Sequence, residues 1–143
     1  MKIAFLADPL AGFKTYKDST FAMMREAAKR GHAVYAFEQK DMALEEGIVT
    51  ALVKHIELTG DEHDWYKVVS TEEVRLSALD AIIERKDPPF DMEYVYGTYL
   101  LELAEKQGAC VFNKPSAIRD NNEKLAIAQF SEFTSPTLVT SDE

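Results

Sequence analysis

The residues with the clearest chemical potential form one short segment, Arg85-Lys86-Asp87-Pro88-Pro89-Phe90-Asp91. Two cations stand between an apolar run at 81–83 and a proline-rich turn, which is typical of a strand that ends where a helix begins. In open α/β sheets, ligands bind beyond the carboxyl ends of the strands, so Arg85 and Lys86 are candidates for contacting a carboxylate or phosphate. A pair of solvated charges explains the same pattern equally well.

The segment that follows has the apolar spacing of a helix. We expect Asp91 to cap this helix, Phe90 to pack on Val95, and Gly108 to end it. Pro88 and Pro89 keep the preceding turn extended, and the sequence leaves open whether either X–Pro bond is cis. The expected buried face consists of the residues spaced by three and four: Met92, Val95, Tyr96, Tyr99, Leu100, Leu103 and Ala104.

The chain before this segment is typical of a β-α-β unit. An apolar run at 2–7 ends in Asp8-Pro9, a helix begins near Asp18 and ends at Gly31, and a second apolar run covers 33–37. We expect a β-hairpin over 41–58 at the edge of the sheet. The remaining expected elements are strands at 65–69, 79–83, 109–112 and from 137, and a helix from Asp120 to about Phe130 with Glu123 in a capping box.

Composition bounds the class of protein. A chain of 143 residues is long enough for one domain, and a net charge of -9 argues against binding to nucleic acid or an anionic membrane. A single cysteine, Cys110, excludes an intrachain disulfide, which fits a protein of the reducing cytoplasm. Because Cys110 lies in an apolar run, we expect it to be a core residue. The apolar run near the N-terminus is too short for a signal or membrane segment.

The motifs that would identify a catalyst are missing. There is no GxGxxG or P-loop pattern and no Ser/His/Asp or Cys/His set. His63 lies among acidic residues, but no second histidine stands at ligand spacing, so a solvated loop is favoured over a metal site. The residues alone therefore predict a binding crevice and no specific chemistry.

Blocks along the whole chain resemble the N-terminal domain of prokaryotic glutathione synthetase, an ATP-grasp ligase. The most specific blocks are 85–94, which contains Arg-Lys-Asp-Pro-Pro-Phe-Asp, and 118–125, which contains Arg-Asp followed by Asn-Glu-Lys-Leu. This resemblance implies an α/β, Rossmann-like (pre-ATP-grasp) domain over 1–143, with a mainly parallel sheet and helices on both faces. It also implies that γ-glutamylcysteine is joined to glycine with ATP and Mg²⁺, through an acyl phosphate.

The resemblance also implies roles for individual residues. Lys124 matches a nucleotide-binding lysine, and Arg85 and Asp8 lie on the dipeptide side of the cleft. Glu84 stands where the family tends to be apolar, and a pair with Arg85 would weaken the reach of that arginine for a substrate carboxylate. At the sequence level, Lys124 also falls in the first turns of the helix expected from Asp120, where a helix dipole favours anions.

The family continues after this stretch into an ATP-grasp domain that the sequence does not include. We therefore expect no catalytic residue and no metal ligand here, and no activity from the isolated chain. The expected partners are small molecules and the missing domain. The helix at 91–107 could also form the interface of a homo-oligomer, but packing of this helix on its own sheet is favoured. A non-catalytic binding or oligomerisation module with the same fold is the alternative.

Overall fold

Strand β1 (Lys2–Ala7) lies at the centre of a sheet in the order β3-β4-β2-β1-β6-β7, with β5 paired to β4. In this computed structural model, which describes residues 1–61, 63–122, 124–140 and 142, β2 (Ala33–Phe37) and β6 (Ala81–Arg85) flank β1 in parallel. The two-residue strand β7 (Val111–Phe112) pairs with β6 in parallel. Both faces of β1 are apolar, as a strand covered on both sides requires.

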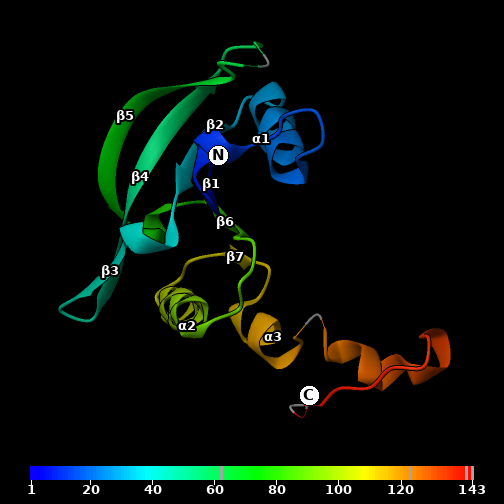
Figure 1. Cartoon of the computed structure of the whole chain (residues 1–143). Helices are drawn as coiled ribbons and strands as arrows, with labels where there is room; N and C mark the ends of the chain where they lie inside the picture. Colours follow the sequence, from blue (N-terminus) through cyan, green and yellow to red (C-terminus); the bar gives the residue numbers. More distant parts are fainter. Residues whose placement is uncertain (62, 123, 141, 143) are drawn as a thin grey trace.

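Helices cover the sheet on both faces. Helix α1 (Ser19–Lys29) joins β1 to β2, and α2 (Met92–Lys106) joins β6 to β7 in the opposite direction along the sheet (Figure 1). Right-handed crossovers in opposite directions place their helices on opposite faces. Accordingly, Phe5 shares one core cluster with Met24 of α1, and Leu6 shares the other with Leu101 of α2. The predicted α/β fold is confirmed.

The antiparallel strands extend one end of the sheet. The predicted hairpin over 41–58 is confirmed as β3 (Met42–Glu45) and β4 (Ile48–Leu58). The short strand expected at 65–69 is instead the longer β5 (Tyr66–Arg75), which follows β4 along most of its length. Most residues of β5 are exposed, so its sequence lacks the apolar alternation that would have revealed its extent.

Helix α2 buries only part of the predicted face, since Ala104 is buried and Leu100 and Leu103 pack partly buried against the core, but the face is rotated from the predicted one. Asp91 caps the helix as expected, because its Oδ1 atom accepts a hydrogen bond from the Tyr94 N–H at 2.9 Å. However, Met92 and Tyr96 are both 60% exposed. The buried positions are Tyr94, Gly97, Thr98, Leu101 and Ala104. The apolar pattern predicted the wrong residues because two buried positions, Gly97 and Thr98, are not large apolar side chains. The Thr98 hydroxyl is hydrogen-bonded, and Gly97 leaves room for Gln39, whose side chain would lie 2.9 Å from a Cβ atom at position 97.

The C-terminal part departs most from expectation. The helix predicted from Asp120 is wrong, because Asp120 is the last residue of α3 (Pro115–Asp120) and does not cap a helix. Pro115, whose ring presets a helical φ, starts α3 at its first position. The capping box would have needed Glu123, which lies outside the described residues. Residues 137–140 form no strand, and Cys110, expected in the core, is exposed just before β7.

Short 3-10 helices complete the described chain. They are η1 (Leu10–Gly12), η2 (Gln39–Asp41), η3 (Leu76–Ala78) and η4 (Ala126–Phe133), the last interrupted at Phe130. In the described part of the chain, no helix is long and apolar enough to span a membrane.

Candidate functional site

A cavity of about 520 Å³ lies beyond the carboxyl end of β6, and we call it the β6 cavity. The strand order changes direction between β1 and β6, and this is where open α/β sheets bind ligands. The cavity brings together Arg85 and Lys124, which the sequence placed in separate segments. It is lined by the turn at 84–90, by Tyr94, and on the other side by Asn113, Ile118, Asn121, Asn122 and Lys124.

Arg85 is held by the first turn of α1. Its Nε atom donates to Thr20 Oγ1 at 3.2 Å and its Nη2 atom donates to Ser19 Oγ at 2.8 Å. An arginine has five N–H donors, so these two bonds orient the guanidinium while other donors can still reach a ligand. Neighbouring residues on a strand point to opposite faces, and the open question of an Arg85–Glu84 ion pair is thereby answered. No ion pair between Arg85 and Glu84 occurs among the described residues.

Asp8 fastens the loop after β1 to the turn after β6. Its Oδ1 atom lies 3.2 Å from Lys86 Nζ, and its Oδ2 atom accepts a hydrogen bond from the Asp87 N–H at 2.8 Å. Asp8 does not line the β6 cavity but a neighbouring one of about 470 Å³, and Lys86 lines both. The geometry thus gives Asp8 the capacity to position Lys86.

Lys86 and the turn that carries it are held closely. Lys86 Nζ also donates to the Asp87 carbonyl oxygen at 3.2 Å and lies 5.9 Å from the centroid of the Tyr94 ring. The Pro88–Pro89 bond is cis, which answers the question that the sequence left open. The ring of Phe90 lies 5.0 Å from that of Tyr94 and closes this side of the cavity.

Glu84 is the buried acid of the site. It is 4% exposed, and its Oε2 atom has no hydrogen-bond partner among the described residues. Burial raises the pKa of Glu84, and the Tyr94 hydroxyl and the Lys86 charge oppose this increase. Burial also raises the pKa of Tyr94, as does the negative charge of Glu84, so this phenol stays protonated near neutral pH.

Tyr94 is the lining residue that periodicity missed. It lies off the predicted apolar face of α2, yet its hydroxyl donates to the Lys86 carbonyl oxygen at 3.3 Å. Its place in the specific block at 85–94 was the signal available in the sequence.

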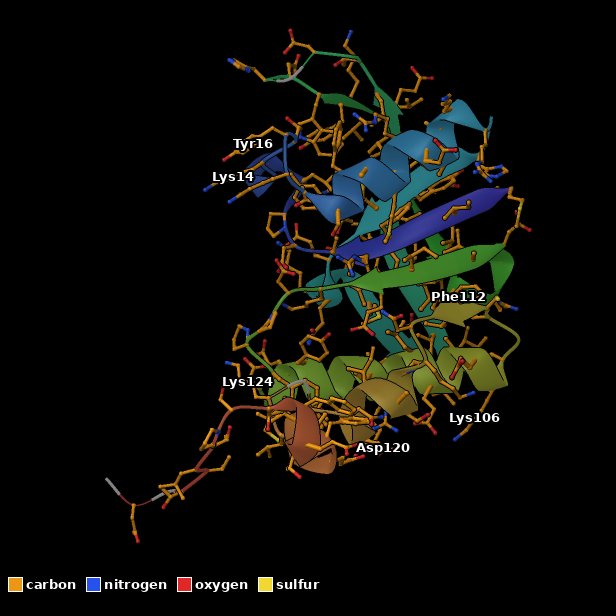
Figure 2. The ribbon with its side chains drawn as sticks, turned by 90° about the vertical axis from the view of Figure 1, so that its right-hand side faces the viewer. Lys14, Tyr16, Lys106, Phe112, Asp120 and Lys124 are labelled. Atoms are coloured by element: carbon orange, nitrogen blue, oxygen red, sulfur yellow. The ribbon has the colours of Figure 1, made fainter. Side chains whose placement is uncertain are left out.

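Lys124 lies in a turn that Asn122 organises. The Asn122 carboxamide oxygen accepts hydrogen bonds from the N–H groups of Lys124 and Leu125 at 3.0 and 3.2 Å. The expectation that Lys124 sits in the first turns of a helix is wrong, because Lys124 lies in the turn between α3 and η4. Figure 2 shows Lys124 on the side to which β6 points, together with Lys14 and Tyr16 from the loop after β1.

The arrangement suits an anionic ligand with polar groups. The basic lining residues Arg85, Lys86 and Lys124 outnumber the acidic ones, Glu84 and Asp87, and three asparagines supply amides: Asn113, Asn121 and Asn122. No cluster of three or more His, Cys, Asp or Glu side chains that could hold a metal ion occurs in the described residues, which include His63.

Comparisons with known proteins agree with the resemblance noted above. Residues 1–119 match the family described as prokaryotic glutathione synthetase, N-terminal domain. The chain is 60% identical over 142 residues to the glutathione synthetase of Ralstonia nicotianae, with 99% of this chain and 44% of that protein covered. It is 53% identical over 146 residues to that of Nitrosomonas europaea, covering 100% and 46% of the two chains. The chain thus spans less than half the length of these relatives.

Proposed function

The chain belongs to the family of prokaryotic glutathione synthetase N-terminal domains, and we propose that it forms the dipeptide side of a glutathione synthetase. In the proposed reaction, a carboxylate oxygen of γ-glutamylcysteine attacks the γ-phosphorus of ATP and ADP leaves. The amine of glycine then attacks the acyl carbon, phosphate leaves, and the amine loses a proton to solvent. The products are glutathione, ADP and phosphate.

The observation that supports this proposal is the position of Arg85, Lys86 and Lys124 around one cavity at the switch point of the sheet. Near neutral pH the dipeptide carries carboxylates, and ATP carries phosphates. Arg85 would bind a dipeptide carboxylate, because a guanidinium matches that group with two parallel donors. Lys124 would supply a point charge to a phosphate of ATP. Asp8 would act indirectly, because it holds Lys86 and the turn after β6 in position.

ATP and Mg²⁺ belong to the complete enzyme in this proposal. Mg²⁺ prefers carboxylate oxygens and phosphates as ligands. The described residues do not bring together enough acidic groups to fit the ion, so we derive no step through Mg²⁺ from this chain. The residues that hold it would lie in the part of the relatives that this chain does not cover, and we propose that the chain alone has no ligase activity.

The test uses a chimeric synthetase in which this chain replaces the matching residues of the Ralstonia nicotianae protein. ADP release should require γ-glutamylcysteine and glycine in the chimera and should be absent with the chain alone. Arg85→Ala should raise the KM for the dipeptide and leave the melting temperature of the chain nearly unchanged, since the Arg85 side chain is partly exposed and its shorter hydrogen bond, to Ser19, is exposed. Turnover by the chain alone, or unfolding caused by Arg85→Ala, would contradict the proposal.

A further inference from the structure

The guanidinium of Arg119 connects α3 to α2 through an extensive set of contacts. Its Nη1 atom donates to Thr98 Oγ1 at 3.1 Å, and its Nη2 atom donates to the Glu102 carboxylate. The guanidinium carbon also lies 4.4 Å from the centroid of the Tyr99 ring. The side chain of Arg119 is 17% exposed, so these contacts are shielded from water more than a surface ion pair is.

Each partner of Arg119 is itself fixed. Thr98 is 1% exposed, and its hydroxyl donates to the Val95 carbonyl oxygen at 2.6 Å, so the oxygen is left to accept from Arg119. The hydrogen bond from Arg119 lowers the pKa of Glu102, with help from the nearby charge of Lys106. Glu102 is therefore ionised over the neutral range. A planar, forked cation satisfies the hydroxyl, the carboxylate and the ring together, and a lysine cannot.

Helix α3 is too short to be stable without packing partners. It spans 6 residues, which is far below the length at which a helix is stable in water by itself. Asn121 follows α3 directly and donates from Nδ2 to the Ala117 carbonyl oxygen at 2.9 Å. Asn122 then organises the turn that carries Lys124. The place of this segment over the β6 cavity is therefore set by how α3 packs on α2.

We propose that Arg119 is a positioning residue, which holds α3 on α2 so that Asn121, Asn122 and Lys124 complete the β6 cavity opposite Arg85. The consequence for ligand binding rests on the proposed function, whereas the positioning of the segment does not. Without Arg119, the cavity residues are chemically unchanged, but the segment that carries them can occupy several positions. The affinity for the ligand then falls in proportion to the fraction of molecules whose segment is in the binding-competent position.

The first experiment measures position in the chain itself. Cys110→Ser removes the exposed native thiol, and nitroxide labels are placed at Met92→Cys on α2 and at Lys124→Cys. Pulsed electron spin resonance should give one narrow distance distribution in this background and a broad one with Arg119→Ala. Arg119→Lys, which keeps the charge without the fork, should also broaden it.

Lys114→Ala is the matched control. Lys114 also links α3 to α2, through an ion pair with Glu105 at 4.0 Å, but its side chain is 69% exposed. This variant should keep the narrow distribution. A narrow distribution in folded Arg119→Ala and Arg119→Lys proteins would overturn the proposal, and so would equal broadening by Lys114→Ala.

The second experiment measures ATP affinity in the chimeric synthetase. If the competent arrangement falls to about a tenth of the population, Arg119→Ala weakens ATP binding about tenfold. The double variant with Lys124→Ala should lose less than the product of the two single effects, because Arg119 acts partly through Lys124. If the labelled chain responds as expected but Lys124→Ala leaves ATP binding unchanged, the positioning role stands and the proposed nucleotide role of Lys124 fails. Fully multiplicative effects would refute action through Lys124.

Discussion

Replacing Glu84 with methionine should stabilise the protein, although it alters a residue of the candidate site. The carboxylate is 4% exposed and its Oε2 atom lacks a hydrogen-bond partner among the described residues. A buried polar atom without a partner costs about 1–3 kcal/mol, and methionine has a similar length with no such atom. Because the interaction with the Tyr94 hydroxyl and the attraction to Lys86 are lost as well, we expect the gain in the free energy of unfolding at pH 8 to lie near the lower end of that range.

The gain should depend on pH in a specified direction. Burial raises the pKa of Glu84 above its ordinary value of 4.5, so the folded protein binds a proton there more readily than the unfolded chain. The free energy of unfolding therefore decreases as pH rises from about 4.5 through the folded pKa. Below that window both states are protonated and the penalty for the charge is absent. The advantage of Glu84→Met over the parent chain should accordingly grow between pH 4.5 and pH 8.

Thermal unfolding of parent and variant at several pH values tests this reasoning. For a chain of 143 residues, each kcal/mol corresponds to a shift of about 3–4 °C in melting temperature. Glu84→Gln is the control, because it removes the charge but keeps a polar group, and it should show the pH effect with a smaller gain. A lower melting temperature for Glu84→Met at pH 8, or an advantage that shrinks as pH rises, would show that the interactions of Glu84 with Tyr94 and Lys86 outweigh the cost of burying it.

Two further outcomes are expected. Asp91→Ala should lower the free energy of unfolding in urea by about 1 kcal/mol through loss of the α2 cap, whereas Glu93→Ala, also in the first turn but without a cap bond, should change it little. In the chimeric synthetase, Lys124→Ala should weaken ATP binding measured by calorimetry by about 1.5–3 kcal/mol, the range for a hydrogen bond to a charged group, and Lys114→Ala should not. Unchanged affinity in Lys124→Ala would remove that lysine from the site.

Local patterns in the sequence were enough to predict the order of the elements up to β7 and the segment that lines the cavity. Apolar runs, Asp18 and Asp91 as caps, and the proline-rich turn are local signals, because each depends on residues a few positions apart. The strand order, and with it the switch point between β1 and β6, was not predicted, because strand pairing depends on residues far apart in the chain. The specific blocks at 85–94 and 118–125 contain Arg85 and Lys124, and the family resemblance that they carry predicts both as site residues.

Long-range packing, in contrast, determines which face of α2 is buried and where α3 lies. Thr98 is a polar residue that becomes a core position because its hydroxyl donates to the Val95 carbonyl oxygen and accepts from Arg119, which is far along the chain. Periodicity reads apolar residues and cannot register such a partner. The packing of α3 on α2, rather than a cap at Asp120, then determines where Lys124 lies.

Only the tertiary structure, likewise, separated the roles of Asp8, Glu84 and Arg85. The sequence placed Glu84 beside Arg85 and left a pair between them open. Strand geometry turns the two side chains to opposite faces, so Arg85 bonds to α1 and Glu84 is buried on the side of α2. The carboxylate of Asp8 meets Lys86 and the Asp87 N–H because β1 and β6 lie in register, with Ala7 opposite Arg85. Contacts between neighbouring strands depend on that register, which no local pattern along either strand specifies.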